Sequence, residues 1–461
     1  MKDKKNTLKS GEARFKGITT AEVIAREGDN APKVLLEEQY QFLGDEDLDF
    51  GRYTSKEFFE KEIKSLWPKI WQWACREEHI QKTGDTYVYE FGPYSVVVVR
   101  SSQKKIQAFL NTCMHRGTKI CPSEGTGYLK KFRCPFHGWS WNLDGSINNI
   151  PGRWDFPHVS ESTHNLQEVK CEVWGGFVFI NLDLKAKPLK NYLEVLPDHF
   201  KAWPLERRHI TIHIQKKLPA NWKSSQEAFL EAYHSYETHS SPTGANCQYD
   251  IFGNYVTRFI HNIAAYSASA LNDYQDKRWT NPPQSETEML EDFGFVELNS
   301  REVPKGSTAR EIVAKELRES LGRKIGVDLS EHGDSIMLDS IQYHLFPNMF
   351  FFPGINIPMA YRFRPDGNKV ENSIFDIFFL SPLPEDKDHP LPPEPHVLGV
   401  DDSYTEVAAL GALGRIFDED TTNLRLQQEG FHTSRKSGIT LGNYQEARIR
   451  RIHQTLDEFL S

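Results

Sequence analysis

Residues 111–139 read NTCMHRGTKICPSEGTGYLKKFRCPFHGW and contain two pairs of cysteine and histidine. One residue separates Cys113 from His115, and two residues separate Cys134 from His137. Each pair sets a thiolate and an imidazole in one tight loop. Two such loops on neighbouring hairpins can enclose a single metal centre. We therefore expect this stretch to organise a small metal-binding domain.

Two kinds of metal centre match this pattern. A Rieske [2Fe–2S] cluster uses two cysteines on one iron and two histidines on the other. A structural zinc site also uses two cysteines and two histidines, but zinc modules usually keep like ligands adjacent. Each half is mixed here, so the pattern favours the Rieske cluster. We interpret the other cysteines as small buried apolar side chains: Cys75, Cys121, Cys171 and Cys247.

Short β-rich runs surround the two loops and predict an all-β domain over residues 70–182. Turn signals such as Gly84-Asp85 and Asp144-Gly145 separate the runs. The expected strands are Thr86–Phe91, Tyr94–Val99, Gln107–Asn111, Phe132–Cys134, Trp139–Asn142 and Val173–Asn181. Residues 1–69 form a tail and helices that we expect to pack on the C-terminal domain, with one helix over residues 54–70.

Residues 183–461 predict an α+β domain with an antiparallel sheet and a long C-terminal helix. The expected strands are Ile210–Leu218, Tyr255–Ala264, Gln342–Phe352, Met359–Arg364 and Ser373–Leu380. The expected helices are Leu189–Phe200, Trp222–His239, Thr308–Leu321, Thr405–Phe417 and Glu446–Phe459. Thr308 and Glu311 form a capping box, and Gly322 is the expected stop. We expect residues 265–340 to form a lid-like insertion.

Composition excludes several classes of protein. The chain has 461 residues and a net charge of −9, so no basic field favours nucleic acid. The longest apolar runs are strand-sized, and no apolar segment follows the first residues, so we expect neither a membrane span nor a secretory signal. Six cysteines are too sparse for a disulfide framework. We expect a cytoplasmic protein.

Residues 231–239 read EAYHSYETH and form a second constellation. On a helix, Glu231 and His234 share a face, whereas His239 does not. The two histidines converge on one ion only if the helix ends or loosens between them. Two imidazoles and one carboxylate make the facial triad of non-haem Fe(II) oxygenases. Isolated histidines on a helix are usually ordinary polar residues, but the upstream cluster motif favours a metal here.

The carboxylate of such a triad must come from another part of the chain. The candidates are Asp250, Asp376, Asp418, Glu419 and Asp420. Three of them lie in one acidic segment, which has a simpler interpretation as a charged helix terminus. The residues alone do not choose between these candidates.

The cluster loops resemble those of Rieske proteins through His115-Arg116-Gly117 and the run Cys134–Trp139. Asn111-Thr112-Cys113 and Asp144-Gly145 are similar to the version in ring-hydroxylating oxygenases. Phe346-Pro347-Asn348 resembles a strand that lines the substrate cavity of that family. The similarity extends from about Tyr53 to Gln428.

The resemblance implies a Rieske domain followed by a helix-grip (START-like) catalytic domain. It implies that Cys113, His115, Cys134 and His137 hold a [2Fe–2S] cluster. It further implies that His234, His239 and Asp420 hold a mononuclear Fe(II). The third iron ligand of the family is often an Asp followed three residues later by Asn, which matches Asp420 and Asn423. Asp418 is the alternative.

The resemblance also implies a trimer in which electrons cross between subunits. By position, Glu231 would bridge a cluster histidine of one subunit and an iron histidine of the next, although many family members have Asp there. Asn221 would border the site. Electrons from NAD(P)H would arrive through a separate reductase, a ferredoxin or both. Whether a small beta subunit completes an α3β3 hexamer stays open.

The expected activity is hydroxylation, once or twice, of a hydrophobic aromatic or polycyclic compound with O2. The apolar strand residues favour such a substrate, although β alternation makes half of them ordinary core: Phe346, Met349, Phe350, Phe351, Phe352, Phe378 and Phe379. An O- or N-demethylase is an alternative with the same ligands. Other classes are a pure electron-transfer Rieske protein, which needs no second metal, and a zinc-stabilised binding module.

Overall fold

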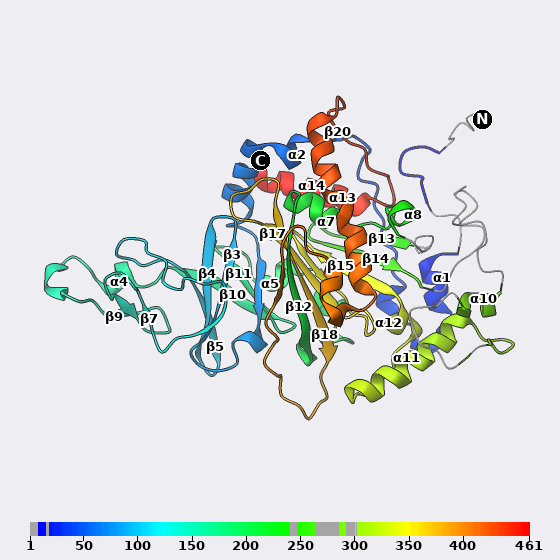
Figure 1. Cartoon of the computed structure of the whole chain (residues 1–461), viewed down its shortest axis with the longest axis horizontal. Coiled ribbons are helices and arrows are strands. Elements are labelled where there is room, and N and C mark those ends of the chain that lie inside the picture. The colour runs from blue at the N-terminus through cyan, green and yellow to red at the C-terminus, as the bar shows by residue number, and fades with distance from the viewer. Residues whose placement is uncertain (1–7, 15–17, 240–246, 264–284, 292–299, 301) are drawn as a thin grey trace.

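The computed structural model describes residues 8–14, 18–239, 247–263, 285–291, 300 and 302–461. A β-rich lobe extends to one side of a larger lobe, in which helices cover an antiparallel sheet (Figure 1). The predicted α+β class, with a small all-β domain before a sheet-and-helix domain, is confirmed. Within the described ranges, no helix combines the length and the apolar character that a membrane crossing needs.

The β-rich lobe contains a seven-stranded and a three-stranded antiparallel sheet. The first has the order β2-β11-β10-β5-β4-β3-β6, and the second has the order β7-β8-β9. Their bounds are β2 Gln72–Arg76, β3 Asp85–Phe91, β4 Tyr94–Ser102, β5 Lys105–Leu110, β6 Gly125–Tyr128, β7 Phe132–Arg133, β8 Ser140–Trp141, β9 Ile147–Asn149, β10 Glu168–Trp174 and β11 Phe177–Asn181.

The seven-stranded sheet separates two hydrophobic cores. Successive side chains of a strand point to opposite faces. On β4, Val96 and Val98 pack into the main core, which continues into the larger lobe. Val97 and Val99 pack into a second core beside Cys113 and the second cysteine–histidine loop. The metal-binding loops therefore lie on the face of the sheet that is turned away from the larger lobe.

The larger lobe contains an eight-stranded sheet of order β13-β14-β15-β16-β17-β18-β12-β19. Neighbouring strands are antiparallel except β19, which is parallel to β12. The bounds are β12 Arg208–Leu218, β13 Cys247–Phe252, β14 Val256–His261, β15 Ser340–Leu345, β16 Met349–Phe351, β17 Met359–Pro365, β18 Ser373–Pro382 and β19 His396–Leu398. A short pair, β1 (Leu48–Asp49) with β20 (Gly438–Ile439), joins the two ends of the chain.

Helices from both ends of the chain cover this sheet (Figure 1). The longest, α13 (Leu413–Thr433), buries a stripe at helical spacing that includes Phe417, Thr421 and Leu424. Among the described residues, the other α-helices are α1 Thr20–Ala25, α2 Gly51–Thr54, α3 Lys56–Lys61, α4 Glu161–His164, α5 Leu189–Tyr192, α6 Leu196–His199, α7 Trp222–Glu227, α8 Ser235–Thr238, α10 Glu286–Glu291, α11 Ala309–Ile325, α12 Asp334–Leu338 and α14 Ala447–Leu460.

Several expected elements have different bounds. The expected helix over Thr405–Phe417 is wrong, because residues 404–410 form two 3₁₀ turns and α13 begins only at Leu413. Gly411 has a φ of 52°, which no right-handed helix contains. The expected stop at Gly322 is also wrong. Helix α11 begins after the capping residue Thr308 as predicted, but it ends at Ile325, before Gly326, whose φ of 72° is left-handed.

Other expected elements are divided. The single strand over residues 173–181 is a hairpin of β10 and β11, because Gly175 and Gly176 both have positive φ values. The strand over residues 342–352 is β15 and β16, interrupted at Pro347, which has no N–H for a ladder. The helix over 54–70 is α3 followed by a π-helical turn (Glu62–Leu66). In the expected lid, residues 265–284, 292–299 and 301 lie outside the described residues.

Candidate metal centres

The two cysteine–histidine loops have the same backbone geometry. In the first, the Cys113 N–H donates to the Thr118 carbonyl at 2.8 Å, and the Gly117 N–H donates to the Cys113 carbonyl at 2.9 Å. In the second, Cys134 and Gly138 make the same two bonds, at 2.8 and 3.1 Å. Gly117 and Gly138 have φ values of 75° and 76°, a conformation that favours glycine. The glycine four residues after each cysteine therefore closes each loop.

These loops bring the four predicted cluster ligands together. The rings of His115 and His137 lie 4.7 Å apart, and Cys113 Sγ accepts a hydrogen bond from the His115 N–H at 3.4 Å. Burial raises the pKa of the Cys134 thiol, but N–H donors from Phe136 and His137 and the neighbouring Cys113 outweigh burial and lower it. Backbone donors thus favour a thiolate, which is the form that binds metal.

His115 and His137 differ in their surroundings. His115 stacks on Trp139 with ring centroids 5.0 Å apart, and its Nδ1 is buried without a hydrogen-bond partner among the described residues. His137 is exposed to solvent. A buried imidazole nitrogen without a partner is costly. Coordination of a metal would satisfy it.

The second constellation lies where a helix ends. The predicted helix over Trp222–His239 is wrong as one element, because α7 ends at Glu227 and α8 spans only Ser235–Thr238. His234 is the residue before α8, and His239 is the residue after it. The condition for convergence is therefore met, because α8 ends at Thr238 and His239 has an extended backbone. This geometry lets both imidazoles turn toward one point.

That point is completed by Asp420 of α13. Its Oδ1 lies 3.3 Å from His234 Nε2 and 3.1 Å from His239 Nε2. One ligand atom from each of the three residues lies within 4.8 Å of the others. Asp420 Oδ1 is buried and has no hydrogen bond of good geometry among the described residues. Such an arrangement suits a divalent cation.

A second carboxylate orients each imidazole from its other nitrogen. Glu231 Oε1 lies 2.8 Å from His234 Nδ1, and Glu419 Oε2 lies 3.0 Å from His239 Nδ1. Burial lowers the pKa of His234, but Asp420 and Glu231 outweigh burial and raise it to about 10. Without a metal the carboxylates keep a proton on the ring. A bound cation would replace that proton as the positive charge that balances the carboxylates.

The other candidate carboxylates have partners elsewhere. Asp250 pairs with Arg258 at 2.8 Å, and Asp376 pairs with Arg362 at 2.8 Å and with Arg364 at 3.2 Å. Asp418 accepts hydrogen bonds from Ser403 and from the Tyr404 N–H. Glu419, which we weighed only as a ligand, instead orients His239. The sequence shows that Glu419 lies next to Asp420. The direction of its side chain, however, depends on where α13 begins.

Asn221 is engaged in structure at the start of α7. Its Oδ1 accepts the Lys223 N–H at 3.1 Å, and its Nδ2 donates to the Val370 carbonyl at 2.7 Å. This is the geometry of a helix N-cap. Its expected place at the border of the iron site stays a prediction.

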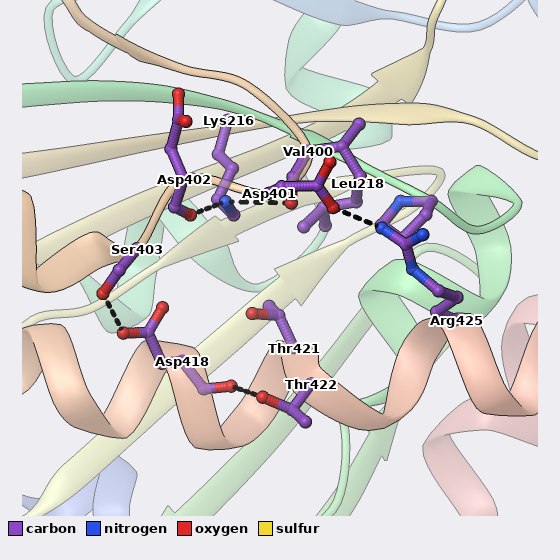
Figure 2. Close-up of a pocket in the computed structure, with 11 residues that line it drawn as sticks. Lys216, Leu218, Val400, Asp401, Asp402, Ser403, Asp418, Thr421, Thr422 and Arg425 are labelled. Atoms are coloured by element: carbon purple, nitrogen blue, oxygen red, sulfur yellow. Dashed lines mark hydrogen bonds and ion pairs between the residues drawn. The ribbon is translucent and has the colours of Figure 1, made fainter.

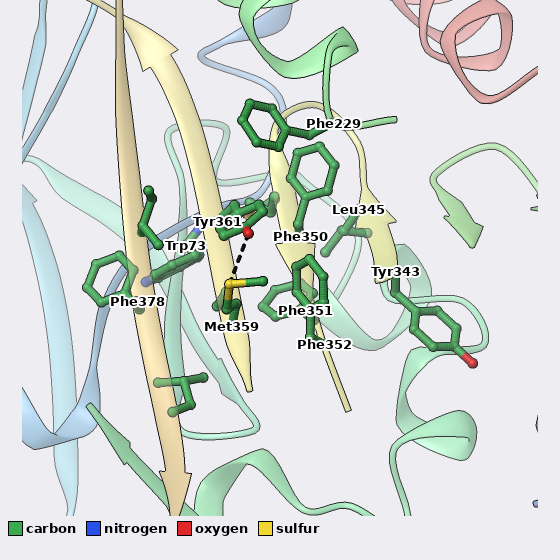
Figure 3. Packing of buried hydrophobic residues seen from close by; sticks show 14 of the residues in the cluster. Trp73, Phe229, Tyr343, Leu345, Phe350, Phe351, Phe352, Met359, Tyr361 and Phe378 are labelled. Carbon is green, nitrogen blue, oxygen red and sulfur yellow. Dashed lines mark hydrogen bonds between the residues drawn. The ribbon is translucent and has the colours of Figure 1, made fainter. Parts of the chain in front are cut away.

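An aromatic layer adjoins Asp420. The Phe350 and Tyr361 rings are 6.0 Å apart, and Phe229, between α7 and the histidines, is 5.7 Å from Tyr361 (Figure 3). Burial and the charge of Asp420 raise the pKa of Tyr361. Phe351, one residue along β16, instead packs 6.2 Å from Trp73 of β2. Phe350 and Phe351 therefore point to opposite faces of the sheet, as β alternation predicts.

The loop of residues 399–404 contacts α13 on the face opposite Asp420. Asp418 and Arg425 point to this loop, and at 100° per residue both lie far around the helix from Asp420. Arg425 pairs with Asp401 at 2.6 Å, and the buried Lys216 donates to the carbonyls of residues 399, 400 and 402 (Figure 2). A cavity of about 250 Å³ lies between loop and helix. These contacts fix the rotation of α13 and so the direction of Asp420.

Comparisons with known proteins show the family of this chain. The profile of the Rieske [2Fe-2S] domain matches residues 70–160. The profile of the ring-hydroxylating alpha subunit (catalytic domain) matches residues 199–461, more than half of the chain. The chain belongs to the ring-hydroxylating alpha subunit family.

Curated relatives share part of their length with this alpha subunit. Benzene 1,2-dioxygenase subunit alpha of Pseudomonas putida is 32% identical over 192 residues, which are 40% of this chain and 42% of the relative. Biphenyl 2,3-dioxygenase subunit alpha of Rhodococcus jostii (strain RHA1) is 32% identical over 197 residues, 41% of this chain and 43% of the relative. Carnitine monooxygenase oxygenase subunit of Escherichia coli (strain K12) is 29% identical over 189 residues, 41% of this chain and 50% of the relative. The matches thus span half or less of these relatives.

Solved structures share the fold of this alpha subunit. A quaternary ammonium Rieske monooxygenase in complex with L-carnitine matches 90% of this chain and 96% of its own, with a TM-score of 0.60 and 16% identity. Naphthalene 1,2-dioxygenase from Rhodococcus sp. matches 90% of this chain and 94% of its own, with a TM-score of 0.60 and 19% identity.

The residues match the cofactors of the family, a Rieske [2Fe–2S] cluster and a mononuclear iron. The first site offers two sulfur and two imidazole donors, with a buried nitrogen of His115 left without a partner. The second site offers two imidazoles and the buried Asp420 Oδ1, which lies within 3.3 Å of both Nε2 atoms. These donor sets are those of a Rieske cluster and a facial triad.

Proposed function

We propose that this chain is the terminal oxygenase component of a multicomponent Rieske oxygenase. Electrons from NAD(P)H would arrive through a separate reductase, a ferredoxin or both. Cys113, His115, Cys134 and His137 would hold the cluster, and His234, His239 and Asp420 would hold Fe(II). The observation that carries the proposal is the convergence of the three iron ligands within 4.8 Å, in a chain that also has both cluster loops.

The chain's own residues position and shield the reaction. When bound, the cluster supplies electrons and the ferrous iron supplies open coordination positions for O2. Glu231 and Glu419 accept from the Nδ1 atoms of the two imidazoles, which leaves each Nε2 free to bind the metal. The aromatic layer of Phe229, Phe350 and Tyr361 excludes water beside Asp420.

The functional unit would be a trimer. Glu231 contacts His234 of its own subunit and would also reach a cluster histidine of the neighbouring subunit. The exposure of His137 supports such a contact, because a ligand that must meet another subunit has to lie at the surface. A small beta subunit could extend the trimer to α3β3.

The substrate would be an apolar aromatic or polycyclic compound, hydroxylated once or twice. Buried aromatic rings beside Asp420 offer flat apolar contacts to such a molecule. The relatives named for benzene and biphenyl support this class.

A second candidate is oxidation or demethylation of a quaternary ammonium compound. Aromatic rings also attract cations of this kind. Tyr361 and Phe229 could surround one next to the charge of Asp420. The carnitine monooxygenase relative supports this alternative.

The test is a single turnover of the purified protein. Anaerobic reduction should give a rhombic EPR signal, and metal analysis should give three irons per chain and no zinc. Reduced protein is then mixed with O2 and with naphthalene, biphenyl or L-carnitine. A hydroxylated arene identified by mass spectrometry would support the first substrate class, and an oxidised carnitine would support the second. Zinc without iron would overturn the assignment.

A further inference from the structure

Two fully buried side chains hold the backbone on both sides of Glu231. Arg448 of α14 donates from Nη1 to the Leu230 carbonyl at 3.1 Å. The Tyr249 hydroxyl of β13 accepts the Ala232 N–H at 3.2 Å. The exposed fractions of Arg448 and Tyr249 are 0% and 1%. The peptide groups before and after Glu231 are therefore fixed by two elements that are distant in sequence.

This segment needs external support. Residues 228–234 lie between α7 and α8 without regular secondary structure. Its own backbone bonds include Leu230 N–H to the Glu227 carbonyl at 3.0 Å and Ser235 N–H to the Ala232 carbonyl at 3.2 Å. Neither of these bonds involves the peptide group between residues 230 and 231 or the one between residues 231 and 232.

The buried guanidinium of Arg448 donates to uncharged acceptors. Its Nε donates to Thr257 Oγ1 at 3.0 Å, and among the described residues it forms no ion pair with a carboxylate. Burial lowers its pKa to about 9. Since burying a guanidinium without a counter-charge is costly, an apolar side chain would serve packing better. However, an apolar side chain could not donate the hydrogen bond that the guanidinium makes to the Leu230 carbonyl.

The ring of Tyr249 packs in a small core, whereas its hydroxyl makes a hydrogen bond. Its ring belongs to a small core with Ala232, Cys247 and Phe259, and it lies 5.3 Å from Tyr444. The hydroxyl adds the bond to Ala232. Removing that one oxygen would keep the ring in this core and would release the peptide group that follows Glu231, together with the contact of the hydroxyl with the Cys247 thiol.

We propose that Arg448 and Tyr249 are positioning residues for Glu231, which set the rate at which electrons cross between subunits. The proposal rests on the proposed role of Glu231 as the bridge. A carboxylate must meet two imidazoles at once, and small displacements of such groups reduce rates strongly. Neither residue contacts a proposed metal ligand in the described contacts, so both act through the backbone of the bridge.

The test uses Tyr249→Phe and Arg448→Lys in the full-length protein, loaded with both metals. The measurements are iron content, the EPR signal of the nitrosyl adduct of the mononuclear site, and stopped-flow reoxidation of the pre-reduced cluster with O2 and naphthalene or L-carnitine, whichever the wild type oxidises. We expect unchanged iron content and cluster spectrum, but reoxidation slower by on the order of tenfold.

Matched controls exist elsewhere in the fold. Tyr343→Phe removes another buried hydroxyl, which contacts Arg258 and His199. Arg208→Lys changes another buried arginine, whose side chain donates to the carbonyls of residues 352–354. Both controls should reoxidise the cluster at the wild-type rate. Equal slowing in test and control variants would overturn the proposal, because it would show a general effect of loosening the core.

A double-mutant cycle tells a positioning role from a structural one. If Tyr249 acts through Glu231, then Glu231→Gln combined with Tyr249→Phe is no slower than Glu231→Gln alone, since coupled residues are not additive. Multiplying effects would overturn the proposal. If Glu231→Gln is slow while Tyr249→Phe and Arg448→Lys are not, the bridge stands and the positioning role fails. If Glu231→Gln itself reoxidises at the wild-type rate, the proposed bridge fails.

Discussion

Three neighbouring acids on α13 have three different contacts. Asp418 binds the loop at Tyr404, Glu419 binds His239 Nδ1, and Asp420 faces both imidazole Nε2 atoms. A helix turns by 100° per residue, so neighbours in sequence must face different surroundings. Chemical identity alone therefore does not tell which acid is the ligand. The rotation of the helix decides it.

Removing the proposed ligand should remove iron without harming the cluster. We expect Asp420→Ala to lose mononuclear iron and turnover, because two imidazoles alone leave the facial triad incomplete. Metal analysis and the visible spectrum measure both centres in one sample. Asp418→Asn is the matched control: its amide oxygen can still accept the hydrogen bonds of Ser403 and of the Tyr404 N–H, so α13 keeps its rotation, and the variant should keep its iron. Iron loss in the Asp418 variant alone would move the ligand by two residues.

Glu419 should affect iron affinity rather than the presence of the site. Glu419→Gln keeps the size of the side chain but weakens the acceptor for His239 Nδ1. Loss of such a partner commonly lowers metal affinity by on the order of 10–100-fold. Titration of apo-protein with Fe(II) measures it. Arg415, which pairs with Glu419 at 3.1 Å, is exposed, so Arg415→Gln should have a much smaller effect. Equal affinities in all three proteins would contradict this assignment.

The sequence pointed to the candidate metal ligands but not to the residues that orient them. Spacing alone pointed to Cys113, His115, Cys134 and His137, because short loops bring near neighbours together. The histidine at 239 required a break in the helix, and that break exists. Glu419 could not be assigned, because its direction depends on α13 beginning after Gly411. The pairing of Asp250 and Asp376 with distant arginines also could not be read from local sequence.

At the scale of elements, α7 is the support of the iron site. All six of its residues are buried, although five are polar. Lys223 pairs with Glu62 at 2.6 Å, and Glu227 lies 2.8 Å from His453 Nε2 and 3.0 Å from the Tyr53 hydroxyl. These partners come from the N-terminal helices and from α14. A helix whose buried polar side chains pair with several other elements can hold the following segment in one position.

Breaking one of these buried pairs should destabilise the whole molecule. Glu62→Gln leaves the Lys223 ammonium buried without its counter-charge, which costs about 3–5 kcal/mol in comparable pairs. The midpoint of urea or thermal unfolding measures the loss. Glu57→Gln breaks the exposed pair with Lys61, 3.8 Å apart, and should leave the midpoint unchanged. A Glu62 variant as stable as the wild type would mean that the buried pair contributes little.

Element boundaries marked by a capping box were predicted well, whereas boundaries set by a positive φ at a glycine were not. The capping box of Thr308 and Glu311 marked the start of α11 correctly. Its end was misplaced, because Gly322 and Gly326 look alike in sequence and only one adopts a left-handed conformation. The hairpin at Gly175-Gly176 was read as one strand for the same reason. A glycine permits positive φ without requiring it.

At the scale of the whole molecule, the two proposed metal centres lie in different lobes. The cluster loops pack on the face of the Rieske sheet that is turned away from the larger lobe, whereas the iron triad lies under α13. The sheet and the main core therefore stand between the loops and the larger lobe of the same chain. This arrangement favours electron transfer across a boundary between subunits, with the exposed His137 on one side and Glu231, whose side chain is 10% exposed, on the other.

Mixed trimers test this directly. Cys113→Ala should lack the cluster, and Asp420→Ala should lack the mononuclear iron, so each variant alone should be inactive. In trimers co-expressed from both chains, an iron-loaded subunit next to a cluster-loaded one should turn over if electrons cross the boundary. In a ring of heterologous contacts, each site then needs one particular neighbour, which gives about a quarter of the wild-type rate for equal expression. Cys121→Ala in place of Cys113→Ala is the control and should keep its cluster, because Cys121 lies outside the two loops. Mixed trimers as inactive as either variant alone would mean that each subunit uses its own cluster, and the role of Glu231 as a bridge would have to be abandoned.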